Sequence, residues 1–522
     1  MPLVSKRDAS RTSSPEDEDE ASAPPPDEHT RLLPNRIDST RAPLLSPDDP
    51  AVSPYNLWSI RLLRYLTIFF TLVTFVWWVI VLVSVFATPP GFHTRGSIFS
   101  SYGFSSLALA NMLFTLIFFI VPSKSVRVLV GVMSFGLLID MIILVSVEKT
   151  RYEEGWVGIV SVVWALLMGL WTLFTDRTVK WGKEEEEQRL TGRAESRHTV
   201  AEWLSIMLST LAYSVMIAAV VLMTGTIILR AVDAGLAPPG NLYWVDGGNY
   251  RLHVYCNGNK TNAMGAMVTT VLFEAGDDPV EHGLWQFAGN AIENGTIQRY
   301  CFADRPGVAW SDTSPSPLSA GFAVDALSEA LAEAGETGPW VLASAGIGSL
   351  YSRVFSARHG HDVAGMLLID PLHETLLGPL ASARVGFFLW LRGILSPLGL
   401  DRLSGAIFRG RGSQDRVYGR SAGQSGKFIF AKLQESLVLN SFTRRDVEGS
   451  RQIQEKSTPL VVVSSGQHIK GDANWEEKQR DLTTLTDALK SWDIVDDAPP
   501  QVWQTEAGRN AIEKRLRQLV KN

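Results

Sequence analysis

Five long apolar runs occupy the first half of the chain, at about residues 65–87, 104–121, 128–147, 155–174 and 203–229. Each run reaches the ~18–20 residues that a helix needs to cross the hydrocarbon core of a bilayer. The runs are apolar on all faces, whereas a helix in a soluble core is apolar along one stripe. The pattern therefore predicts a transmembrane region of five helices within residues 55–232.

Residues 239–522 follow a different pattern, in which short apolar runs alternate with amphipathic segments. The expected strands are residues 242–246, 250–256, 269–275, 298–303, 340–344, 364–370, 459–465 and 492–496. These runs lack strict polar alternation, as is typical of parallel strands buried on both faces. Strands separated by helical segments predict a doubly wound α/β sheet in a single domain.

The first 54 residues are rich in Ser, Pro, Asp and Glu and nearly free of aromatic residues. Such a segment cannot bury enough apolar surface to offset chain entropy, so we expect a disordered tail. Within it, Glu28, Leu32 and Leu33 of EHTRLLP are similar to acidic dileucine signals that sort proteins to lysosomes or vacuoles. The two interpretations are a sorting signal and a plain disordered tail.

Lysine and arginine are concentrated before the first apolar run and in alternate loops after it, which predicts a cytosolic N-terminus. An odd number of spans then places residues 239–522 in a lumen or outside the cell. Sequons for N-glycosylation begin there at Asn259 and Asn294. Cys256 and Cys301 lie there too, where a disulfide persists. We expect a multi-pass protein of the endomembrane system or the vacuolar membrane.

Composition and motifs exclude several functions. The net charge is −6 and no basic patch is present, so nucleic acid is not an expected partner. Two cysteines are too few for a thiolate metal site, and the sequence has no phosphate-binding glycine loop or Cys/His metal spacing. We expect no cofactor and no metal.

Asp140 lies inside the third apolar run. A carboxylate at that depth is costly, which suggests a function such as transport. The alternative is that Asp140 pairs with Asn111 or another polar group between the helices.

Residues 338–359, GPWVLASAGIGSLYSRVFSARH, read as a strand, a tight turn and a helix. They resemble the elbow on which α/β-hydrolases hold a nucleophilic serine, Gly-x-Ser-x-Gly. The segments YRLHVYCNG, VLFEAGDD, FADRPGVAWSD and AGMLLIDPLHE are similar to other blocks of that family, in the same order. The resemblance implies a mostly parallel eight-stranded sheet with helices on both faces. It also implies a cap at about residues 374–457, and neighbouring second and fourth strands that a Cys256–Cys301 disulfide would join.

The match to the elbow places the nucleophile position on Gly346, which has no side chain. The family's histidine position falls near Pro500, although catalysis needs a base there. What remains is an acid at Asp370 or Asp472 and backbone for an oxyanion pocket at Ala275, Gly276 and Ile347.

The favoured interpretation is a catalytically inactive hydrolase-like domain, anchored among membrane lipids, that binds a lipid or acyl ligand or presents itself to a protein partner. The alternative is an active serine ester or lipid hydrolase with Ser344 as nucleophile and His373 or His468 as base. Transport through the helix bundle is the least favoured. The apolar cap segment 385–403 either contacts lipid or simply covers the site.

Overall fold

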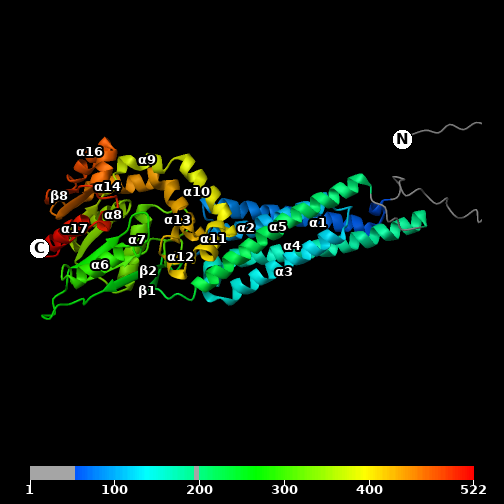
Figure 1. The fold of residues 1–522 in the computed structure, drawn as a ribbon, viewed down its shortest axis with the longest axis horizontal. Coiled ribbons are helices and arrows are strands. Elements are labelled where there is room, and N and C mark those ends of the chain that lie inside the picture. Colours follow the sequence, from blue (N-terminus) through cyan, green and yellow to red (C-terminus); the bar gives the residue numbers. More distant parts are fainter. Residues whose placement is uncertain (1–52, 193–198, 522) are drawn as a thin grey trace, which may run out of the picture.

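A computed structural model describes residues 53–192 and 199–521, which form a helix bundle and an α/β domain along one long axis (Figure 1). Among these residues, five helices are long and apolar enough to cross a membrane. They are α1 (Trp58–Phe86), α2 (Ile98–Ile117), α3 (Lys124–Ser146), α4 (Glu148–Thr191) and α5 (Val200–Asp233). The tail with Glu28, Leu32 and Leu33 lies outside the described residues.

Each helix begins several residues before its apolar run, and side chains of Ser97, Ser123 and Thr199 cap the starts of α2, α3 and α5. The Thr199 side chain and Glu202 form a capping box at the start of α5. Gly155 interrupts α4 with φ +60°, which favours glycine.

Asp140 is fully buried in α3, and its carboxylate oxygens have no hydrogen bond of standard geometry among the described residues. Asn111 is not the partner, because its amide donates to the Met168 carbonyl and to Thr172 and its oxygen accepts from Tyr213. The polar group beside Asp140 is instead Thr224 of α5, which fits the alternative of a polar partner between the helices.

The α/β domain is built on a sheet of eight strands, counted over the described residues. The strands are β1 (Asn241–Val245), β2 (Tyr250–Asn257), β3 (Thr270–Glu274), β4 (Tyr300–Ala303), β5 (Trp340–Ala345), β6 (Val363–Ile369), β7 (Leu460–Ser465) and β8 (Leu489–Val495). Their order is β1-β2-β4-β3-β5-β6-β7-β8, and only the pairs made by β2 are antiparallel. The expected mostly parallel α/β-hydrolase sheet is confirmed. A Cys256–Cys301 disulfide joins β2 to β4.

Helices cover both faces of this sheet. One buried core packs the sheet against α7 (Ala320–Glu333), α8 (Gly348–Arg358), α14 (Arg444–Ile453) and α16 (Ala473–Leu482). The other packs it against α6 (Leu284–Glu293) and α17 (Glu506–Val520). Helix α15 (Gly466–Gly471) follows β7. The strands are therefore buried on both faces, which explains why they lack polar alternation.

The insertion between β6 and β7 reaches from the α/β domain to the helix bundle (Figure 1). It contains α9 (Leu377–Leu380), α10 (Ala383–Leu395), the 3₁₀ turn η4 (Ser396–Leu398), α11 (Leu400–Arg409), α12 (Ser413–Val417), α13 (Gly426–Val438) and α14. A Cβ added at Gly393 would collide with the Phe99 ring of α2, and one at Gly399 with Thr226 of α5. This close packing fixes the insertion to the bundle.

A second set of contacts joins the α1–α2 loop to the loop after β4. The Thr313 hydroxyl lies 2.8 Å from the Thr94 carbonyl oxygen and 2.9 Å from that of Gly96. The Ser316 amide donates to the Thr88 hydroxyl. The bundle and the α/β domain therefore meet over an extended polar and apolar contact.

Candidate ligand pocket of the α/β domain

A pocket of about 230 Å³ opens at the carboxyl ends of the parallel strands. It is lined by residues that follow β3, β5, β6, β7 and β8, together with Leu380 of the insertion. This edge is where open α/β sheets bind their ligands, because all the strand-to-helix turns converge there.

Gly346 forms the tip of the turn between β5 and α8, with φ +50°. A Cβ at this position would lie 3.7 Å from the Gly276 Cα, which is ordinary contact distance. The three residues proposed for an oxyanion pocket, Ala275, Gly276 and Ile347, line the same pocket as Gly346.

An acid and a histidine meet beside this position. Asp370 directly follows β6 and His468 lies in α15, and the Asp370 Oδ2 is 2.6 Å from the His468 Nδ1. The other oxygen of Asp370 accepts from the Ser465 amide at 3.1 Å and from the Trp475 indole at 3.0 Å. Asp370 is 2% exposed, so these donors fix its carboxylate.

His468 is held from two sides and stays open to the pocket. Its ring packs on Trp475, with 4.4 Å between ring centroids, and its side chain is 42% exposed. The hydrogen bond to Asp370 raises the pKa of His468. An imidazole oriented by a buried carboxylate is the general-base half of a catalytic triad.

Ser344, the alternative nucleophile, does not reach the pocket. It is fully buried within β5, in register with Glu274 and Leu368, and its hydroxyl has no hydrogen-bond partner among the described residues. Strand geometry thus directs Ser344 into the core two residues before the turn.

The remaining predicted residues take other places. Both ring nitrogens of His373 are engaged, by Thr375 and by Asp481. Asp472 caps α16 by accepting from the Asn474 amide. Pro500 lines the pocket but carries no proton-transferring group.

A buried ionic cluster supports the Ala275–Gly276 loop. Arg305 donates to the Gly276 carbonyl and lies 3.4 Å from both Glu274 and Glu435. Burial raises the pKa of Glu274 to about 8, even with this guanidinium beside it. Arg305 therefore fixes the loop from behind.

Three groups of potentially metal-ligating side chains lie outside the pocket among the described residues. One is the Cys256–Cys301 disulfide with Glu336, and the other two contain a histidine. In one of these two, His253 bonds to Asp304 at 2.9 Å, and burial raises the pKa of the adjoining Glu281 well above its usual range. Both Glu281 oxygens and the Nε2 of His253 have no hydrogen-bond partner among the described residues. In the other, His373 forms a hydrogen bond with Asp481 at 2.8 Å. Glu374 accepts hydrogen bonds from Arg353 and Arg451.

Asn259 is exposed, and so is Asn294, whose amide donates to Glu513.

The fold and the pocket define a class: a membrane protein with an α/β-hydrolase-fold domain, in which Gly346 forms the turn after β5. The family model described as "Region of unknown function (DUF2417)" matches residues 28–256. "Uncharacterized protein C23C11.06c" of Schizosaccharomyces pombe is 31% identical over 525 residues, covering 94% of this chain and 96% of the relative. The chain belongs to the same family as this relative.

A more distant relative from Saccharomyces cerevisiae carries the description "Uncharacterized vacuolar membrane protein". It is 26% identical over 386 residues, which cover 62% of this chain and 59% of the relative. Among solved structures, the enol-lactonase from Burkholderia xenovorans LB400 overlaps 54% of this chain and all of its own, with 14% identity and a TM-score of 0.38. The strand order, and not this overlap, defines the fold.

Proposed function

We propose that the α/β domain is a non-catalytic relative of the serine hydrolases that binds the acyl part of a lipid or other acyl ligand. The observation that carries this proposal is Gly346, which occupies the nucleophile position while Asp370, His468 and the Ala275–Gly276 loop remain around it. A site that keeps its binding parts and lacks its nucleophile retains recognition without acyl transfer.

The size of the pocket limits the ligand. About 230 Å³ is below the roughly 300–1,000 Å³ typical of sites that enclose a drug-sized molecule. Leu372, Leu380 and Trp503 contribute apolar walls, while Asp370 and His468 lie at the polar end. A short acyl chain, or the head end of a longer one, fits this arrangement.

The proposal also places the domain on the lumenal or extracellular side of an endomembrane or vacuolar membrane. The vacuolar description of the yeast relative supports the compartment, while the sequons at Asn259 and Asn294 and the Cys256–Cys301 disulfide support the side. A faster-migrating band after glycosidase treatment, lost in Asn259→Gln/Asn294→Gln, is expected. An unchanged band would count against glycosylation at these asparagines.

The test of ligand binding uses the full-length chain in detergent and a photoreactive fatty acid. We expect crosslinks to peptides that line the pocket, reduced by Leu372→Trp, which fills it, and unchanged by Leu437→Trp on the exposed face of α13. Crosslinking that is equal in the two variants would overturn the acyl-binding proposal. A serine-directed fluorophosphonate should not label the natural chain at Ser344.

One observation favours a second function. The Asp370–His468 pair has the arrangement of a general base. A water molecule beside Gly346 would be the nucleophile that His468 deprotonates, and an ester would be the substrate. Ester hydrolysis that resists fluorophosphonate and disappears in His468→Ala would select this function over simple binding.

A further inference from the structure

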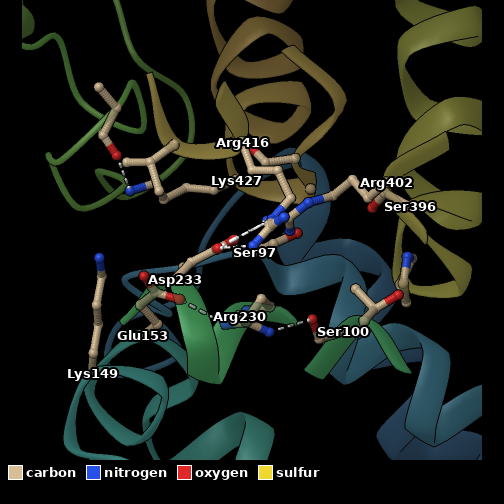
Figure 2. Close-up of a pocket in the computed structure, with 17 residues that line it drawn as sticks. Ser97, Ser100, Lys149, Glu153, Arg230, Asp233, Ser396, Arg402, Arg416 and Lys427 are labelled. Atoms are coloured by element: carbon tan, nitrogen blue, oxygen red, sulfur yellow. Dashed lines mark hydrogen bonds and ion pairs between the residues drawn. The ribbon is translucent and has the colours of Figure 1, made fainter. Parts of the chain in front are cut away.

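A second cavity, of about 80 Å³, lies between the helix bundle and the insertion, away from the pocket of Gly346 (Figure 2). The ends of α2, α4 and α5 that face the α/β domain form one side, and η4, α11, α12 and α13 form the other. A water needs roughly 10–15 Å³ on this measure, so the cavity has room for a group of several non-hydrogen atoms.

Positive charge exceeds negative charge around this cavity. Five cations line it: Lys149, Arg230, Arg402, Arg416 and Lys427. The carboxylates that face them are Glu153 and Asp233, with Glu154 paired to Arg230 from behind. Within this set the cations outnumber the carboxylates by two, although Asp312 and Asp304 also act on Lys427 from outside the lining. Unpaired charge is costly where it is buried, as at Arg402 and Arg416.

The two arginines of the insertion share one carboxylate. Arg416 lies 2.5 Å and Arg402 lies 2.9 Å from Asp233 at the end of α5, and Figure 2 shows the three side chains converging. Both arginines are more than nine-tenths buried. The Arg402 Nε has no hydrogen-bond partner among the residues that the structure describes, so it is a buried donor awaiting an acceptor.

Lys427 is a further cation of this lining; it is half-buried, and its hydrogen bonds go to neutral groups. Its ammonium donates to the carbonyl oxygens of Ala309 and Ser311, at 2.7 and 2.9 Å. Burial lowers the pKa of the Lys427 ammonium, and the charges of Glu153, Asp312 and Asp304 offset only part of the lost hydration. An anion in the cavity would offset the remainder.

Neutral donors face the same space. Helix α2 begins after Ser97 and α13 after Ser425, and both serines line the cavity. Helix N-termini favour anions because their amide groups and dipoles point outward. Gly426 leaves this space open, since a Cβ there would come within 2.9 Å of the Ser97 and Ser396 hydroxyls. Arginine forks with hydroxyl and amide donors are typical of phosphate recognition.

An apolar groove of about 350 Å³ continues from the cavity, and Ser396 and Arg402 line both. Its walls include Phe388, Leu395 and Leu400, which are 55%, 46% and 55% exposed. The helices α10–η4 and α11 that carry them bend by 52°. Exposed apolar side chains beside apolar transmembrane helices suit an acyl chain.

We propose that this cavity and groove together bind one anionic phospholipid, with the phosphate group among Arg402, Arg416 and Lys427 and an acyl chain along α10 and α11. The groove and the position at the end of the apolar helices favour a membrane lipid over a free phosphate. The bound lipid joins the bundle to the insertion by neutralising the cations at their contact. The site does not depend on what occupies the pocket of Gly346.

The test uses the full-length chain in nanodiscs of phosphatidylcholine, with or without phosphatidic acid, followed by native mass spectrometry and thermal unfolding. We expect retained phosphatidic acid and a higher unfolding midpoint in its presence. Arg402→Gln and Lys427→Gln should each weaken retention about 10- to 100-fold, which is the effect of losing one charge-assisted hydrogen bond. Arg409→Gln removes the same charge from the exposed end of α11 and should leave retention unchanged.

Three outcomes would overturn the proposal. One is equal retention by the Arg402 and Arg409 variants. Another is a midpoint in the natural chain that phosphatidic acid does not change, which decides the question even where a variant fails to fold. The third is stabilisation by inorganic phosphate as strong as that by the lipid, together with no effect of Leu395→Asp in the groove. That last result would assign the cavity to a soluble phosphate.

Discussion

Replacing Gly346 with serine is the most direct probe of the pocket. The change returns a hydroxyl to the position where this fold carries its nucleophile. An added Cβ lies 3.7 Å from the Gly276 Cα, so no atom has to move. The cost is the backbone angle, because a non-glycine residue at φ +50° loses roughly 1–2 kcal/mol. Folded domains have about 5–15 kcal/mol of stability, so the variant should fold.

The gain should be reactivity towards a fluorophosphonate. His468, oriented by Asp370, would take the proton of the new serine. We expect labelling of Gly346→Ser and none at this site in the natural chain. Adding Asp370→Asn should slow labelling by on the order of 10²–10⁴-fold, since the imidazole loses the carboxylate that fixes its tautomer.

The pH dependence gives an independent readout. The neutral form of His468 is the base, and Asp370 raises its pKa, so labelling should increase with pH through a midpoint above the ordinary histidine value of about 6.5. Asp370→Asn should move that midpoint down. A folded Gly346→Ser variant that stays unlabelled, or that labels equally after His468→Ala, would refute the assignment of this pocket.

Other predictions concern the core and its stability. Ser344→Ala should leave fluorophosphonate labelling unchanged and shift the free energy of unfolding by less than about 1 kcal/mol, because the buried hydroxyl has no partner among the described residues. Labelling or hydrolysis that the substitution abolishes would instead support Ser344 as a nucleophile. Cys256→Ala with Cys301→Ala should cost about 4 kcal/mol in denaturant titrations, from the 45-residue separation; an unchanged midpoint contradicts this. The Arg451 hydrogen bond lowers the pKa of Asp481 to about 2. Its stabilisation is present above the unfolded value near 4 and disappears as pH falls to 2, so Asp481→Asn should flatten acid unfolding there; superimposable curves would argue against it.

Much of the fold can be predicted from the sequence, because the lengths and spacing of the apolar runs agree with the helices and strands that form. The apolar runs coincide with α1–α5, and the eight expected strands lie within a few residues of β1–β8. The flanking match also locates Gly346 at the turn, where glycine tolerates the positive φ.

The order of catalytic residues along the chain in this fold does not predict the pairing of Asp370 with His468. In that order the base follows the last strand, near Pro500, whereas the structure places His468 after β7. The available signal was that both residues directly follow adjacent strands, and such ends meet at one edge of a parallel sheet. The cavity between the helix bundle and the insertion cannot be predicted from the sequence in this way, because Asp233 and Arg402 lie 169 residues apart in the chain.

The insertion between β6 and β7 has a mechanical consequence. In a hydrolase a cap can swing on hinges, but here Gly393 and Gly399 press against Phe99 and Thr226 without space for a methyl group. The insertion is therefore expected to move as one unit with α2 and α5. A tilt of either helix would then displace Leu380, which lines the ligand pocket. A bilayer whose thickness changes the tilt of these helices is therefore expected to change the shape of the ligand pocket as well.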